Sequence, residues 1–175
     1  DSEILLFMRE QAEIAIRSAD VIVFVTEIGT GVTAADQEVA AMLKRSHKPV
    51  VLCVNKMDSV GQVDPGIYEL GVPVLGFCYG HQITAVTLGG KVFHPEVGEY
   101  GPAELEREAK SALFNSTPMK QTVWMSHFDA VCDVPEGFVV TARTAVCPVA
   151  AMENAEKRIY TTQFHPEVKH TEFGQ

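Results

Sequence analysis

Three short, continuous apolar runs constrain the fold of this 175-residue chain more than any other feature. A run of this length is typical of a strand that is buried on both faces of a parallel sheet, because such a strand has no polar face. Stretches with helical spacing separate the runs, and strands that alternate with helices indicate an α/β architecture. The runs are residues 21–25, 49–54 and 73–77.

Helices are expected on either side of these strands. Residues 3–18 repeat apolar side chains at the spacing of one helix face. Thr33 is positioned to cap a second helix that runs to about residue 46. A third helix is expected at residues 80–88, directly after the last apolar run.

After Gly90 the pattern changes to short strand-like segments joined by turns. These segments are expected to add antiparallel strands to the sheet or to flank it. The chain is therefore predicted to form a single three-layer α/β domain, with a mainly parallel sheet between helices and added antiparallel strands in its C-terminal half. The segments are residues 91–97, 122–125, 138–142 and 158–164.

Composition excludes several classes of function. The net charge of −9 argues against nucleic-acid binding, which needs clustered Lys and Arg. No apolar run reaches the length of a membrane span, and the first residues do not resemble a signal peptide. The four cysteines form no C-x-x-C pair, so no zinc site or other metal site is predicted, and a reducing cytoplasmic location is expected. Cys53 lies in an apolar run and is expected to be a buried thiol.

The most informative local pattern surrounds Cys78. An apolar strand leads directly into Gly-x-Cys-x-Gly and then into a helix, which is the form of a nucleophile elbow. Gly76 and Gly80 would relieve crowding around a strained Cys78. The helix N-terminus would favour the thiolate, and the backbone N–H of Tyr79 would bind a developing oxyanion.

A cysteine nucleophile also needs a base and an orienting carboxylate. His165 and Glu167, in the string Gln-Phe-His-Pro-Glu, follow a predicted strand and supply both from one turn. The competing interpretation makes Cys78 a buried structural thiol between two turn glycines. A second His-Pro-Glu string begins at His94 and is interpreted as a solvated turn.

Residues from about 63 to 175 resemble the class I glutamine amidotransferase domain of GMP synthase. The resemblance rests on several strings in the family's order and spacing, and it covers about two-thirds of the chain. The strings include residues 69–76, 78–82, 88–92, 99–101, 123–127, 147–151 and 163–168.

This resemblance implies a flavodoxin-like fold of the class I amidotransferase type and the hydrolysis of L-glutamine to glutamate and ammonia. Cys78 would attack the side-chain amide, His165 would move the proton and Glu167 would orient His165. Phe128 stands where the family usually has Gly. No metal, cofactor or synthetase half is implied. The positions that match the glutamine pocket are Gly80, Gln82, Ser126, His127 and Asp129.

Residues 1–61 resemble a different family, an internal fragment of a bacterial GTPase domain of the Der/EngA type. Asn55, Lys56 and Asp58 fit the N-K-x-D motif that reads guanine. GTP and GDP binding is nevertheless not expected, because the chain has no Gly-rich phosphate loop with Lys and Ser/Thr. The strings that carry the resemblance are residues 11–16, 19–25, 31–36 and 48–58.

The two resemblances together predict an engineered chimera, with residues 1–62 and 63–175 as its two fragments. The amidotransferase family carries a Gly-Gly loop where this chain has residues 55–58, and that loop supplies a second oxyanion donor. Losing one such donor costs about 10²–10³ in kcat, so weak or absent glutaminase activity is expected. Two alternatives stay open: a recombined scaffold without activity, and a remnant that binds guanine nucleotides.

Overall fold

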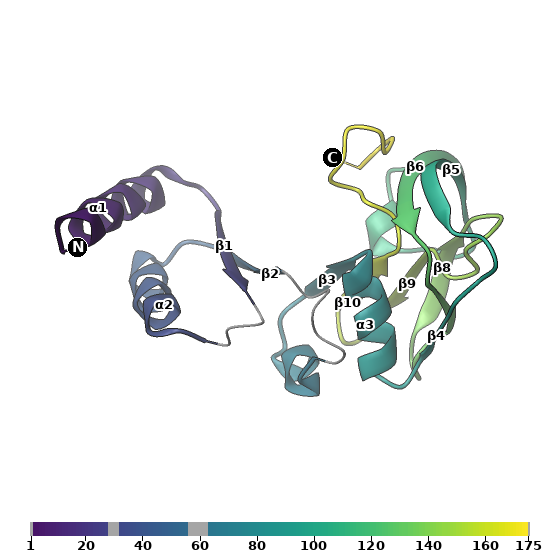
Figure 1. The fold of residues 1–175 in the computed structure, drawn as a ribbon, viewed down its shortest axis with the longest axis horizontal. Helices are drawn as coiled ribbons and strands as arrows, with labels where there is room; N and C mark the ends of the chain where they lie inside the picture. The colour runs from purple at the N-terminus through teal and green to yellow at the C-terminus, as the bar shows by residue number, and fades with distance from the viewer. Residues whose placement is uncertain (1, 28–31, 56–62, 175) are drawn as a thin grey trace. The chain divides into compact units, whose positions relative to one another are not determined.

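The computed structural model describes the whole chain except residues 1, 28–31, 56–62 and 175, and it divides into two compact units (Figure 1). Unit 1 is Asp1–Val60 and unit 2 is Gly61–Gln175. Among the described residues, no helix is both long enough and apolar enough to cross a membrane.

Unit 1 alternates helices with strands, as the sequence predicts. Its two strands pair in parallel along their whole length, with Ile22 opposite Val50 and Glu27 opposite Asn55. Thr33 caps the second helix in a capping box: its hydroxyl accepts from the Asp36 N–H at 3.1 Å, and the Asp36 carboxylate accepts from the Thr33 N–H at 2.8 Å. The elements are α1 (Ser2–Ser18), β1 (Ile22–Glu27), α2 (Ala34–Ser46) and β2 (Val50–Asn55).

The strands of unit 1 are not buried on both faces, contrary to the prediction. Val23 is 61% exposed and Leu52 is 58% exposed, and Cys53, expected to be buried, is exposed as well. The reason is that β1 and β2 form a sheet of two strands with no further strand bonded to it in the described residues. Of the side chains described in unit 1, Leu43 is the one buried hydrophobic residue.

Unit 2 contains a six-stranded sheet in the order β3-β10-β9-β8-β5-β6 and a separate antiparallel pair, β4-β7. The α3 helix follows β3 and contacts β3, β4, β7 and β10 (Figure 1). Two 3₁₀ turns, η2 (Pro65–Glu69) and η3 (Ala112–Phe114), lie in the connections. The remaining elements are β3 (Val74–Phe77), α3 (Tyr79–Thr87), β4 (Lys91–Phe93), β5 (Glu99–Arg107), β6 (Lys120–His127), β7 (Ala130–Asp133), β8 (Val139–Arg143), β9 (Ala151–Asn154) and β10 (Ile159–Thr162).

The predicted fold class, α/β with antiparallel strands added in the C-terminal half, is confirmed. The parallel pairs are β1–β2 and β3–β10, and the other pairs of the described residues are antiparallel. The longest strand, β5, was not predicted because Gly101 and Pro102 interrupt its pattern. Pro102 is tolerated because β8 pairs only with Glu106 and Arg107, which leaves Pro102 bonded to β6 alone.

Two groups of buried apolar side chains hold unit 2 together. The larger group includes Leu105, Val123 and Met125, all 0% exposed, on the paired strands β5 and β6. The smaller group includes Ala85 of α3 and Met152 of β9 and lies against the helix. Ala85 joins α3, the helix that follows Cys78, to the smaller group, and Phe164, just after β10, belongs to the larger one.

Candidate active site

Cys78 lies between β3 and α3 and has a positive φ, with φ 49° and ψ −107°. A residue other than glycine rarely adopts such angles, and it does so at a cost of about 1–3 kcal/mol that the surroundings must offset. One surrounding contact is the Cys78 N–H, which donates to the Thr162 carbonyl at the end of β10 at 2.8 Å. The predicted sharp turn from strand to helix is therefore present at Cys78.

Only one of the two flanking glycines is required by close packing. A Cβ on Gly76 would lie 2.9 Å from the Gly80 carbonyl oxygen and 3.1 Å from Cγ2 of Thr161. A Cβ on Gly80 would meet nothing within 4 Å. The predicted relief of crowding is therefore confirmed at Gly76 alone. The backbone that lies close to Gly76 is that of Gly80, and a side chain at Gly80 would meet no nearby atom.

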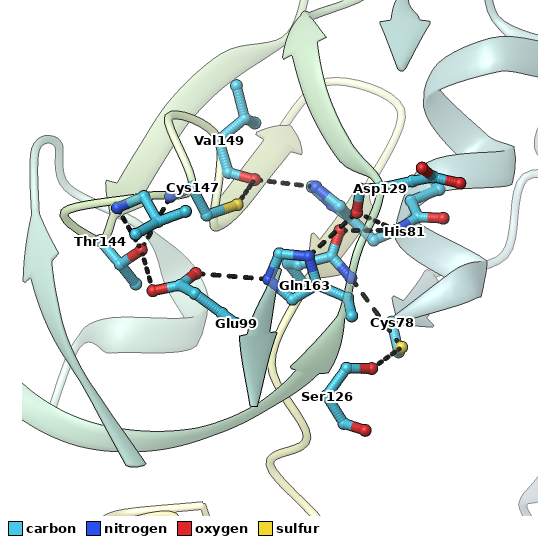
Figure 2. A network of polar contacts seen from close by, with 12 residues as sticks. Cys78, His81, Glu99, Ser126, Asp129, Thr144, Cys147, Val149 and Gln163 are labelled. Carbon is cyan, nitrogen blue, oxygen red and sulfur yellow. Dashed lines mark hydrogen bonds and ion pairs between the residues drawn. The ribbon is translucent and has the colours of Figure 1, made fainter. Parts of the chain in front are cut away.

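The Cys78 thiol is partly buried and holds two weak hydrogen bonds (Figure 2). Its Sγ donates to the Ser126 carbonyl at 3.7 Å and accepts from the Gln163 amide at 3.9 Å. Burial raises the pKa of the Cys78 thiol; the Tyr79 N–H lowers the pKa, and the Glu167 charge raises it further. The predicted stabilisation of the thiolate is therefore outweighed by burial, although the Tyr79 N–H acts in the predicted direction.

His165 and Glu167 form the expected pair. Nδ1 of His165 lies 2.8 Å from Oε1 of Glu167. Because a carboxylate accepts, Nδ1 carries the hydrogen in this pair, which leaves Nε2 of a neutral imidazole free to take a proton. The backbone N–H of His165 donates to the Trp124 carbonyl at 3.0 Å and anchors the turn. Within the described residues, the hydrogen bonds of the Cys78 thiol do not reach His165.

Three of the residues predicted to line the substrate pocket, Gln82, His127 and Asp129, are connected by hydrogen bonds. The Gln82 amide donates to the Asp129 carbonyl at 2.6 Å and to Oε1 of Gln163 at 3.0 Å. Nδ1 of His127 donates to the same Asp129 carbonyl at 2.9 Å. Gln82 and His127 are buried, and both hold the backbone at Asp129 in place. Gly80 lies in the first turn of α3.

His94 lies in an exposed irregular segment, as the predicted solvated turn implies, with 72% of its side chain accessible, but the side chain also makes two contacts that the sequence does not predict. Its Nδ1 lies 2.6 Å from Oδ1 of Asp129, and its ring stacks on Phe128 with a centroid distance of 4.2 Å. The resemblance described above leads one to expect Gly at position 128, which could not form this stack. No pattern in the sequence indicates the pairing, because His94 and Asp129 are 35 positions apart.

His81 is fully buried and uses both ring nitrogens. Nε2 donates to the Val149 carbonyl at 3.0 Å, and Nδ1 then accepts from the Thr161 hydroxyl at 2.7 Å. Burial lowers the pKa of His81 to about 3, and the nearby His127 lowers it as well, while the bond to Val149 opposes the change. The neutral ring ties α3 to β10.

Two other predicted features lie elsewhere. Asn55 ends β2 in unit 1, while Lys56 and Asp58 lie outside the described residues. Of residues 55–58, the expected replacement for the oxyanion loop, all but Asn55 therefore lie outside the described residues. Among those that are described, Glu99, His127 and Cys147 could hold a metal ion, since their ligand atoms all lie within 4.8 Å of one another.

Comparisons with known proteins agree with this geometry. The sequence model of the family "Glutamine amidotransferase class-I" matches residues 54–175. GMP synthase [glutamine-hydrolyzing] of Clostridium novyi (strain NT) is 58% identical over 114 residues, which cover 65% of this chain and 22% of that protein. The same enzyme of Thermobifida fusca (strain YX) is 48% identical over 141 residues, which cover 78% of this chain and 27% of that protein. The chain thus spans about a quarter of the length of these relatives.

Solved structures with the same fold include a GMP synthase-type protein from Thermoplasma acidophilum, with a TM-score of 0.64 at 25% identity and 89% of both chains covered. A glutamine amidotransferase from Thermotoga maritima matches with a TM-score of 0.56 at 15% identity, covering 85% of this chain and 76% of that one. Because the family model matches well over half of the sequence, the chain belongs to the class-I glutamine amidotransferases.

Proposed function

We propose that this chain hydrolyses the side-chain amide of L-glutamine to glutamate and ammonia. The observation that carries the proposal is the strained Cys78 at the start of α3, with the His165–Glu167 pair close enough that the Glu167 charge acts on its thiol. The relatives named above are glutamine-hydrolysing enzymes, and their similarity covers this part of the chain.

The reaction would proceed through a thioester. Sγ of Cys78 attacks the amide carbon while Nε2 of His165 takes the thiol proton. The carbonyl oxygen becomes an oxyanion, to which the Tyr79 N–H donates. His165 then gives the proton to the leaving nitrogen, and ammonia departs as the thioester forms. Water, deprotonated by His165, attacks the thioester and releases glutamate, with the proton returning to the Cys78 sulfur.

His165 must lie close to the Cys78 thiol before it can take the thiol proton. Catalytic hydrogen bonds are often long or misaligned without substrate and tighten in the reactive complex. The weak bonds of the thiol to Ser126 and Gln163, at 3.7 and 3.9 Å, are easily exchanged for one to His165. Substrate that covers the site would sit against the pocket residues proposed from the sequence: Gly80, Gln82, Ser126, His127 and Asp129.

The rate is proposed to be low. In the sequence, residues 55–58 stand where the family has its Gly-Gly loop, so the oxyanion would receive one backbone donor in place of two. The loss of one donor corresponds to about 10²–10³ in kcat. The ammonia would serve a GMP synthase type of reaction, and hence purine biosynthesis, if a synthetase partner consumes it.

The origin of residues 1–61 stays a prediction from the sequence. We infer a GTPase parent and a chimera joined near residues 61–63, which coincides with the division between units at Val60 and Gly61. The family match begins at residue 54, inside the fragment assigned to the GTPase, so it does not mark this join. Titration with GDP tests whether the chain still binds guanine nucleotides. No binding is expected, because the sequence contains no phosphate-binding loop.

Covalent labelling tests the nucleophile. A diazoketone analogue of glutamine is expected to add to Cys78 in the intact chain, and mass spectrometry of the digest locates the adduct. Cys78→Ala should abolish both labelling and ammonia release, whereas Cys132→Ala, which removes an exposed thiol, should leave them unchanged. Ammonia release that persists in Cys78→Ala would disprove the mechanism. If the analogue does not label Cys78 in the unaltered chain, the alternative of a scaffold without activity would be favoured.

Glu167→Gln separates the two effects of the carboxylate. The negative charge of Glu167 raises the pKa of the Cys78 thiol, so its removal should speed alkylation of Cys78 by iodoacetamide near neutral pH. The same change removes the acceptor that orients His165, so kcat for glutamine should fall, by up to about 10²–10⁴ if general-base action is lost entirely. Alkylation and hydrolysis that change in the same direction would contradict this assignment.

A further inference from the structure

Glu99, His127 and Cys147 bring three metal-binding groups together away from the Cys78 thiol. Glu99 begins β5 and His127 ends β6, and the two residues are directly opposite in the antiparallel register. Cys147 comes from the turn between β8 and β9. The side chains of His127 and Glu99 are 3% and 11% exposed, and Cys147 is buried.

The hydrogen bonds of His127 leave a lone pair that faces a carboxylate. Nδ1 of His127 lies 2.9 Å from the Asp129 carbonyl, which can only accept, so Nδ1 carries the hydrogen. In the neutral ring, Nε2 is then an acceptor, and it lies 3.3 Å from Oε2 of Glu99. Two acceptors do not face each other in a buried site unless a positive charge lies between them: either a proton or a metal ion.

Glu99 and Cys147 are oriented by the same threonine (Figure 2). The Thr144 hydroxyl donates to Oε1 of Glu99 at 2.7 Å and accepts from the Cys147 N–H at 2.9 Å. This contact uses one carboxylate oxygen and leaves Oε2 toward His127. Such support of a ligand by a neighbouring hydroxyl, and of a ligating imidazole by a carbonyl, is typical of metal sites in proteins.

The thiol of Cys147 can lose its proton without leaving a buried group unpaired. Sγ donates to the Val149 carbonyl at 3.4 Å, and the same carbonyl accepts from Nε2 of His81 at 3.0 Å. Burial and then the Glu99 charge raise the pKa of the Cys147 thiol to about 12, so the thiol keeps its proton while no cation is present. A cation between these groups removes the repulsion from Glu99.

We propose that Oε2 of Glu99, Nε2 of His127 and Sγ of Cys147 bind a divalent cation of the zinc type, with a fourth position open. Two ligands at about 2.0–2.1 Å from a tetrahedral zinc lie about 3.3 Å apart, which matches the distance between Nε2 and Oε2. Binding forms the sulfur–metal bond and releases the thiol proton to solvent. The charges of the carboxylate and the thiolate then neutralise the divalent ion.

A groove from solvent reaches Glu99, the one of the three proposed ligands that lines it. The groove, of about 510 Å³, also includes Glu104 and Glu106 together with Arg143. The bound ion would hold His127, and His127 holds the Asp129 carbonyl that also anchors Gln82. The site is therefore structural support beneath the proposed pocket, and it does not depend on glutamine hydrolysis.

Cobalt titration of the full chain, stripped with a chelator, tests the site. Co²⁺ is expected to bind at one ion per chain with a thiolate-to-cobalt charge-transfer band in the near ultraviolet, and Zn²⁺ is expected to bleach the band by displacement. Cys147→Ser should abolish the band. Cys132→Ser and Cys78→Ser, which alter thiols outside the cluster, should keep it.

Two further variants keep the test decisive if Cys147→Ser fails to fold, as judged by circular dichroism. Thr144→Val removes the hydroxyl that orients Glu99 and should weaken Co²⁺ binding about 10–100-fold. Glu99→Gln should weaken it at least as much. Absence of the band in the parent chain, a band that survives in folded Cys147→Ser, or unchanged affinity in Glu99→Gln would each overturn the proposal. The cluster would then be a protonated His127 paired with Glu99.

Discussion

At the scale of single residues, His81 shows how burial sets a protonation state. Its two ring nitrogens are bonded to the Val149 carbonyl and the Thr161 hydroxyl, and burial of the ring favours the neutral form. The pKa of about 3 in the fold lies below the ordinary value of 6.5. The unfolded chain therefore binds a proton on His81 at a pH where the folded chain does not.

This difference predicts a pH dependence of stability. Since the unfolded state holds more protons between pH 6.5 and about pH 3, the unfolding free energy should fall as pH decreases through that range, by up to about 1.4 kcal/mol per pH unit from His81. His81→Gln should flatten this slope, whatever its effect on stability at neutral pH. Urea denaturation at several pH values, with a chelator present, measures both slopes. Parallel slopes for the two proteins would contradict the prediction.

The sequence predicts those site residues whose geometry is local. Gly-x-Cys-x-Gly after an apolar run specifies the turn at Cys78, and His165 reaches Glu167 within one turn of chain. Glu99 and Cys147 are 48 positions apart in the chain, so no short sequence pattern indicates that they lie in one cluster. The rise in the pKa of the Cys78 thiol has no sequence signal for a related reason: the desolvation of the thiol depends on the tertiary packing around it.

At the scale of elements, the β3–α3 turn depends on one close approach. A methyl group at Gly76 would meet the Gly80 carbonyl, which is backbone and cannot move aside cheaply. Gly76→Ala should therefore lower the unfolding free energy by about 1–3 kcal/mol. Gly80→Ala meets no atom within 4 Å in α3 and should raise it by about 0.5–1 kcal/mol. Urea denaturation followed by Trp124 fluorescence compares the two variants, and equal effects would argue against the packing explanation.

The elements were predicted unevenly. Strands with β-branched or aromatic runs, such as β8 and β10, were placed correctly to within a few residues. The short strands β7 and β9 were missed, as was β5, because each gains its pairing from partners far along the sequence. Apolar runs also predicted burial in β1 and β2, whereas burial depends on what covers a strand and not on its own composition.

At the scale of the whole molecule, the two units differ in how much apolar surface they bury. Both groups of core side chains lie in unit 2, and Leu43 is the one buried hydrophobic residue among the described side chains of unit 1. Segments with few buried apolar contacts open at low free energy. The helices α1 and α2 have 17 and 13 residues and α3 has 9, so most of the α-helical signal comes from unit 1.

Two probes should therefore report different unfolding transitions. Far-UV circular dichroism follows mainly α1 and α2, whereas the single tryptophan, Trp124 in β6, reports on unit 2 alone. In a urea titration, the dichroism midpoint should lie at a lower concentration than the fluorescence midpoint, because unit 1 has little core to lose. Met125→Ala should shift the fluorescence midpoint by the equivalent of about 2–5 kcal/mol, while Val23→Ala, at an exposed position, should not shift it. Coincident transitions would instead show that the chain unfolds as the single domain predicted from its sequence.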